Sequence, residues 1–186
     1  MTRFQTFTPD MEVWGQVMMS FANATRAENI IPYLKKHNLF PIDPDRWYLA
    51  QPFLDVLHDI YEVDKTESVS DFVSIGLRIS EEVLFPEDYD QYSFEEKMMI
   101  WDGVYQANHR GSMVGGIESE LVTPGHIRYV LNTIYPDDLN YGVLYGIVRK
   151  HIPANTQFTV SYDESESPRS DNGGDFSVFD LKWMPK

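Results

Sequence analysis

The sequence contains no cysteine among its 186 residues. This absence excludes a disulfide framework, a thiolate nucleophile, and zinc or iron–sulfur sites with Cys ligands. The spacings of common catalytic and nucleotide-binding motifs are also missing: there is no HExxH, HxH, GxGxxG, GxxxxGK[ST], GxSxG or SxxK. No residue set in the sequence therefore predicts an enzyme or a metal site.

Basic residues are scarce, with 15 Lys and Arg against 29 Asp and Glu and a formal net charge of -14. Nucleic acids and anionic lipid heads attract basic surfaces, so we expect neither as a partner. The sequence has no run of about 18 apolar residues, the length that a membrane-spanning helix needs. Its N-terminus lacks the apolar segment of a signal peptide. We expect a cytoplasmic protein without a membrane span.

The remaining composition is that of a globular protein, with 42% hydrophobic and 14% aromatic residues. The length fits a single domain over residues 1–186 that buries a core without help from metals or disulfides. Aromatic side chains are expected mainly to fill this core, and they also suit the walls of a pocket for a flat apolar ligand.

Helix-like spacing of apolar residues dominates the first part of the chain, about residues 1–110. Ser93 and Glu96 form a capping box for the last helix of this part, and Gly111 stands where its C-terminal cap is expected. The five predicted helices cover residues 11–23, 25–38, 45–63, 68–85 and 93–109.

Alternating apolar residues predict strands in the second part, about residues 111–186. The last strand carries aromatic residues on both faces, which predicts a central position in the sheet. The four predicted strands cover residues 113–121, 126–135, 158–162 and 176–183, and one helix covers 139–151. This order predicts an α+β fold in which N-terminal helices pack on a C-terminal antiparallel sheet with one inserted helix.

Residues 105–111 (YQANHRG) place an aromatic ring, an amide, an imidazole and a guanidinium near the end of a predicted helix. One interpretation is structural, because basic groups at a helix C-terminus interact favourably with the helix dipole. The other is a polar cluster at the helix–sheet junction that binds an anionic or haem-like ligand, with His109 as an axial ligand. The sequence leaves both open.

Three segments of the second part follow one another in a familiar order: residues 135–146 (YPDDLNYGVLYG), 158–163 (FTVSYD) and 176–183 (FSVFDLKW). Together with the glycine-rich strand pair before them, they resemble a superfamily of ligand-binding domains. It includes the 4-vinyl reductase domain, the haem nitric-oxide-binding domains and the TRAPP-type vesicle-transport subunits, and the resemblance is closest to uncharacterised bacterial members.

This resemblance implies a cavity between helices and sheet for a small apolar or tetrapyrrole-like molecule, haem included. The Tyr-x-Ser-x-Arg signature that holds haem propionates in nitric-oxide sensors is absent, and residues 129–133 (YVLNT) do not replace it. The ligand-binding residues expected here are Trp101, Tyr105, Asn108, His109, Arg110, Tyr141 and Tyr145.

Three functions follow as hypotheses. The first is a small-ligand-binding sensory or regulatory domain with an apolar pocket. The alternative is a non-catalytic protein-interaction module that forms a homodimer, as in the vesicle-transport relatives. The third, an enzyme of the vinyl-reductase type, has no supporting residue set.

Overall fold

The computed structural model describes residues 4–25, 27–63, 68–83, 85–165 and 168–184. The helical part contains β1 (Glu12–Trp14), α1 (Gly15–Ala24), α2 (Ala27–Lys36), β2 (Trp47–Leu49), α3 (Ala50–Val63), α4 (Ser68–Glu82), η1 (Tyr89–Gln91), α5 (Phe94–Met99), α6 (Trp101–Ala107) and β3 (His109–Arg110). The second part contains β4 (Gly116–Thr123), β5 (His126–Asn132), α7 (Asp137–His151), β6 (Phe158–Tyr162), η2 (Ser170–Asn172) and β7 (Ser177–Trp183). The predicted α+β class is confirmed, with both sheets antiparallel.

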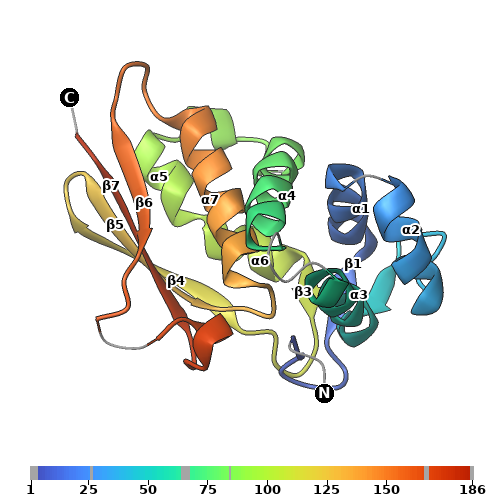
Figure 1. Ribbon diagram of the computed structural model, residues 1–186. Helices are drawn as coiled ribbons and strands as arrows, with labels where there is room; N and C mark the ends of the chain where they lie inside the picture. Colours follow the sequence, from blue (N-terminus) through green and yellow to red (C-terminus); the bar gives the residue numbers. More distant parts are fainter. Residues whose placement is uncertain (1–3, 26, 64–67, 84, 166–167, 185–186) are drawn as a thin grey trace.

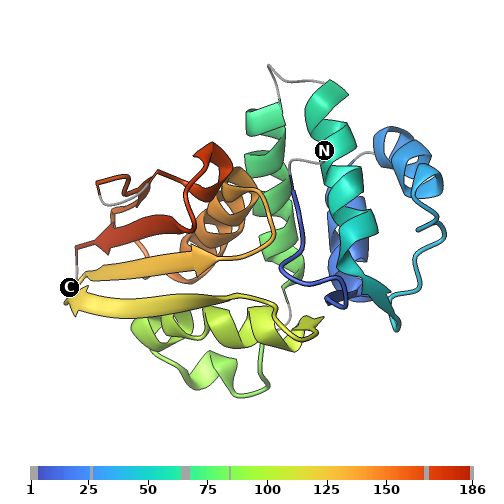
Figure 2. The same cartoon turned by 90° about the horizontal axis from the view of Figure 1, so that it is seen from below.

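The larger sheet has the strand order β4-β5-β7-β6. The central position predicted for β7 is confirmed, since β7 pairs with both β5 and β6. Tyr129 and Phe179 face each other in the register of β5 and β7, and neither side chain is exposed. They belong to a core that the sheet shares with α5, α6 and α7. Figure 2 shows α6 lying along β4.

A smaller sheet of order β2-β1-β3 is absent from the sequence prediction. Residues 12–14 form a strand, so the helix expected from residue 11 begins only at Gly15. Residues 47–49 form its partner, and α3 follows from Ala50, with Pro52 in its first turn. Strands of two or three residues are too short to show an alternating pattern, which is why sequence periodicity misses them.

The predicted helix over residues 93–109 is interrupted at Ile100, which separates α5 from α6. Its capping box is confirmed: the Ser93 hydroxyl accepts from the Glu96 N–H at 3.2 Å, and the Ser93 N–H donates to the Glu96 carboxylate at 2.7 Å. The cap predicted at Gly111 is wrong, because α6 ends at Ala107 and β3 follows. Gly111 instead takes a φ of 146° beside Met11, where a Cβ would lie 2.9 Å from the Met11 Cα.

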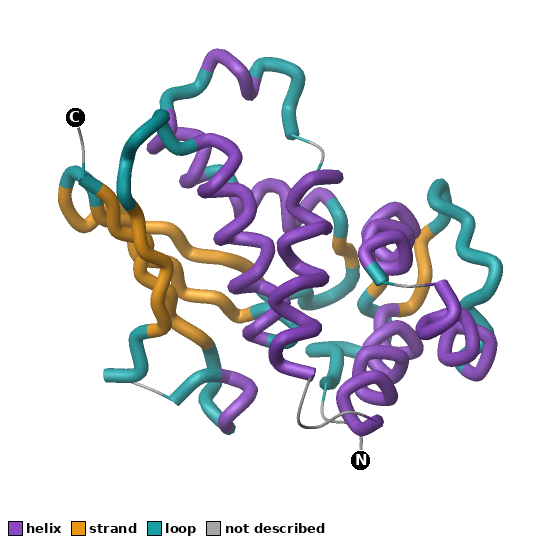
Figure 3. The backbone as a smooth tube through the Cα atoms, turned by 45° about the horizontal axis from the view of Figure 1, so that its top comes forward, coloured by secondary structure: helices purple, strands orange, loops and turns teal. Residues whose placement is uncertain are grey.

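Helices α4 and α7 run side by side between the two parts of the molecule (Figure 1, Figure 3). Their contact is made by glycines. A Cβ on Gly142 would overlap the Val73 carbonyl oxygen and come within 3.0 Å of the Gly76 Cα, and a Cβ on Gly146 would overlap the Ser80 side chain. At Gly76 and Gly142 the two backbones therefore touch directly, with no room for a side chain between them.

Two hydrophobic cores lie on either side of this helix pair. The first is built mainly by α1, α2 and α3, and it also takes Phe72 and Ile75 from α4 and Leu139 from α7. The second is built by the larger sheet with α5, α6 and the later residues of α7, such as Leu144 and Val148. Among the described residues, no helix has the length and apolar character needed to cross a bilayer.

Candidate ligand-binding cavity

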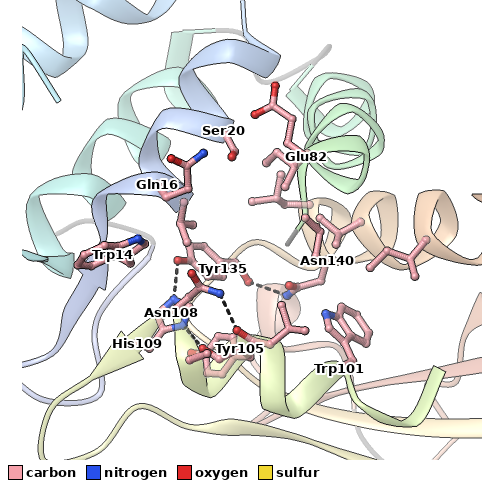
Figure 4. Close-up of a pocket in the computed structure, with 18 of the residues that line it drawn as sticks. Trp14, Gln16, Ser20, Glu82, Trp101, Tyr105, Asn108, His109, Tyr135 and Asn140 are labelled. Atoms are coloured by element: carbon pink, nitrogen blue, oxygen red, sulfur yellow. Dashed lines mark hydrogen bonds between the residues drawn. The ribbon is translucent and has the colours of Figure 1, made fainter. Parts of the chain in front are cut away.

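A cavity of about 460 Å³ lies where the N-terminal helices meet the sheet half of the molecule. Side chains of α1, α4, α6 and α7 line it (Figure 4). It is therefore bounded by the two cores, and both contribute to its wall.

Most of the side chains that line the cavity are aromatic or aliphatic. Examples are Trp14, Phe21, Trp101, Tyr105, Val143 and Leu144. Among the described lining residues only Glu82 and Lys97 carry a formal charge, one of each sign. Glu82 is exposed, and the Lys97 ammonium lies 5.0 Å from the centre of the Tyr89 ring. The interior thus suits an apolar molecule without a net charge.

His109 sits in the wall with both ring nitrogens engaged. Its Nδ1 lies 2.6 Å from the Tyr105 carbonyl oxygen, and its Nε2 lies 2.7 Å from the Tyr135 hydroxyl. A carbonyl oxygen only accepts, so Nδ1 carries the proton and Nε2 accepts from Tyr135. The imidazole also stacks on the Tyr105 ring, with centroids 4.1 Å apart.

Burial fixes the protonation states of this group. It lowers the pKa of His109 to about 4, against an opposing effect of the hydrogen bond to Tyr105, so the imidazole is neutral at pH 7. Burial also raises the pKa of Tyr105 and the pKa of Tyr135 above the ordinary value for tyrosine. The Tyr105 hydroxyl donates to the Val114 carbonyl at 2.7 Å. This wall of the cavity therefore consists of neutral, hydrogen-bonded groups.

Two further polar side chains are buried in the lining. Asn140 of α7 is 7% exposed, and its amide nitrogen donates to the Thr133 hydroxyl at 2.9 Å and to the Tyr135 carbonyl at 3.4 Å. Ser20 of α1 is 6% exposed. Figure 4 shows Ser20 on the α1 side of the cavity and Asn140 on the α7 side.

No protein-family model and no curated protein matches this sequence. Solved structures of H-NOX (haem nitric-oxide/oxygen-binding) proteins do match. An H-NOX protein from S. oneidensis in the Fe(II)NO ligation state has a TM-score of 0.67 at 13% identity, over 92% of this chain and 99% of that one. A point mutant of T. tengcongensis H-NOX has a TM-score of 0.63 at 16% identity, over 92% and 95%.

An oxygen-binding H-NOX domain related to soluble guanylate cyclases gives a TM-score of 0.63 at 14% identity, over 92% of this chain and 93% of that one. The fold is H-NOX-like. At these identities the likeness concerns the fold alone. The superfamily that the sequence resembles, with its haem nitric-oxide-binding domains, vinyl reductases and vesicle-transport subunits, stays a prediction.

Four of the predicted site residues line the cavity of this H-NOX-like fold: Trp101, Tyr105, Asn108 and His109. Trp101 and Tyr105 are four positions apart on α6 and therefore share one helix face. Asn108 and His109 follow directly after the helix, and the Asn108 amide donates back to the Val104 carbonyl at 2.7 Å.

The other three predicted residues lie outside the lining. Arg110 is exposed on β3, where it forms an ion pair with Glu12 at 2.5 Å and lies 4.5 Å from the centre of the Trp47 ring. Tyr141 and Tyr145 are on the face of α7 that packs on β6: the Tyr141 hydroxyl donates to the Val160 carbonyl at 3.3 Å, and the Tyr145 ring lies 5.1 Å from that of Phe158.

Ser20, Tyr135 and Asn140 line the cavity but are not among the predicted site residues. Asn140 stands in the first turn of α7, where a polar residue looks like an ordinary helix start. Its signal is the set of apolar neighbours on the same helix face, Leu139, Val143 and Leu144. Ser20 carries a comparable signal, since it interrupts the apolar face of α1 formed by Val17 and Phe21.

Proposed function

We propose that this chain is a small-ligand-binding sensory or regulatory domain whose ligand occupies the cavity between the two cores. The observation that carries this proposal is the cavity itself. A volume of about 460 Å³ with mainly apolar walls falls within the range of roughly 300–1,000 Å³ that is usual for ligand pockets.

Haem is the ligand that the fold suggests, since several H-NOX neighbours are described by their Fe(II) ligation states or their haem redox potential. Haem iron needs an axial ligand with a free lone pair. His109 is the only imidazole in the described lining, and its Nε2 already accepts the Tyr135 hydroxyl proton. The Nδ1–carbonyl bond is common in metal-bound histidines, so the contact that decides is the one at Nε2.

The charged residues of the cavity wall also argue against haem. Two haem propionates need basic partners, but the described lining offers Lys97 alone, with Glu82 as an opposing charge. The residues present therefore do not fit haem, and the ligand that they fit is a neutral and mostly apolar molecule.

A ligand in this position contacts both cores, because α1 lines it from one side and α6 and α7 line it from the other. Binding therefore favours one relative arrangement of the two cores, which is the property that a sensory domain uses.

The test is native mass spectrometry of the protein purified from its own host, combined with an absorbance scan and a haemin titration. We expect a bound small-molecule mass without a Soret-type band, and no stoichiometric Soret band with added haemin. A stoichiometric haemin complex would contradict the exclusion of haem. A protein that carries no added mass and takes up no apolar probe would contradict the proposed function, and a stable dimer in sedimentation would then favour the interaction module predicted from the sequence.

A further inference from the structure

The polar groups in the cavity wall differ in whether the protein supplies all of their hydrogen-bond partners. The hydroxyls of Tyr105 and Tyr135 each donate a proton to a protein acceptor, and both His109 nitrogens are used. These groups therefore require no hydrogen bond from a ligand. Asn140 is different: it is the buried amide of the lining, and the protein satisfies only its nitrogen.

The orientation of the Asn140 amide is fixed by its neighbours. One of them, the Tyr135 backbone carbonyl, can only accept, so the amide nitrogen must be the atom that faces it. The second N–H of this nitrogen is used by the Thr133 hydroxyl. Both donors are thus occupied, and the amide oxygen, Oδ1, is left without a hydrogen-bond partner among the described residues. A side chain that is only 7% exposed seldom leaves an acceptor unpaired.

From this geometry we propose that the ligand is a neutral, mainly apolar molecule with one hydroxyl group, an alcohol or a phenol, which donates its proton to Asn140 Oδ1. This inference rests on the proposed function of the cavity. Trp101 offers the complementary group, an indole N–H without a hydrogen-bond partner among the described residues. In Figure 4 its ring nitrogen is on the side of the ring nearer to Asn140. A hydroxyl oxygen accepts as well as donates, so it suits both side chains.

Ser20 is the other buried polar side chain of the wall without a hydrogen-bond partner among the described residues. Ser20 requires no hydrogen bond from a ligand, because a serine hydroxyl in a helix can rotate to donate to the carbonyl of the preceding turn. Ser20 is therefore a suitable control position, being polar, buried and in contact with the same cavity.

The experiment compares three probes of one shape by titration calorimetry: 2-naphthol, 2-methoxynaphthalene and naphthalene. Only 2-naphthol can donate a hydrogen bond. An apolar cavity without a polar determinant binds the two more hydrophobic probes more tightly. We expect the opposite order for the wild-type protein, with 2-naphthol binding about tenfold more tightly than 2-methoxynaphthalene.

Asn140→Leu should reverse this order, and Ser20→Ala should keep it. Loss of the preference in Ser20→Ala but not in Asn140→Leu would overturn the assignment to Asn140. The ranking in the wild-type protein is decisive even if Asn140→Leu does not fold: a purely hydrophobic order would overturn the inference and leave the proposed function intact. Failure of all three probes to bind would instead remove the proposed function and the inference with it.

Discussion

Helix α4 has two sides that are packed in opposite ways. Toward α7 the backbones touch at Gly76 and Gly142, and no Cβ fits between them. Toward α1 and α6 the same helix, through Ile79 and Glu82, borders about 460 Å³ of free space. The close contact next to the cavity shows that the space is a local feature, and that the α4–α7 pair is the rigid element beside which a ligand would bind.

The largest effect is expected from a substitution in the close contact between α4 and α7. Gly142→Leu places a side chain where the Val73 carbonyl lies and must push α4 and α7 apart. We expect the free energy of unfolding to fall by about 3 kcal/mol or more, measured by urea denaturation. Gly103→Ala is the matched control, since a Cβ there meets nothing within 4 Å. A Gly142→Leu protein as stable as Gly103→Ala would refute the close contact.

The stability of the protein should fall in acid, because the wall of the cavity contains the buried His109. The pKa of this imidazole is about 4 in the folded protein, against an ordinary value of 6.5. Between these values the unfolded chain binds more protons, so the free energy of unfolding falls as the pH falls from about 6.5 to 4, by up to about 3 kcal/mol. His109→Gln lacks this titration. Equal slopes of stability against pH in the two proteins would contradict the neutral, buried imidazole.

A smaller loss should follow from Tyr135→Phe, which removes one hydroxyl from the cavity wall. His109 Nε2 then loses its donor while it stays buried, which costs about 1–2 kcal/mol in the free energy of unfolding. Thermal denaturation measures this loss. The same variant frees Nε2, so a haemin titration tests the reason for excluding haem. We expect a Soret shift with Tyr135→Phe and none with the wild-type protein.

The smallest change in stability is expected from a substitution that fills the cavity beside α4. Val104→Phe projects a larger side chain into the cavity and should alter the free energy of unfolding by no more than about 1 kcal/mol. Binding of 2-naphthol should be lost. Val122→Phe, at an exposed position on β4, is the control that should keep binding. Unchanged binding in Val104→Phe would place the ligand outside this cavity.

Local patterns account for what the sequence predicts well. The capping box at Ser93 and the central strand β7 each depend on residues within one element. The smaller sheet does not, because it joins Glu12 to Arg110, 98 positions apart. The place of Arg110 outside the cavity lining has the same origin: its partners Glu12 and Trp47 are distant in sequence.

The contacts of Asn140 in the cavity wall are close in sequence, but they depend on the conformation of the turn before α7, which periodicity does not predict. We propose that residues 1–186 form a single domain, because α7 contributes residues to both cores and α4, which packs along α7, belongs to the first core. One calorimetric unfolding transition would support it, and two separate transitions would contradict it.

The pairing of β1 with β3 has a mechanical consequence. The Trp14 N–H donates to the Asn108 carbonyl at 3.0 Å. Trp14 directly precedes α1 and Asn108 directly follows α6, so this hydrogen bond joins the start of α1 to the end of α6. Two opposite walls of the cavity are thus joined at one end, as at a hinge, while no hydrogen bond between described residues joins their other ends, at Ala24 and Trp101. A change in the angle between α1 and α6 would open the space between Ala24 and Trp101, which makes that side the expected route of ligand entry. The hydrogen bond of 2.8 Å from Arg78 of α4 to the Ala24 carbonyl opposes this movement.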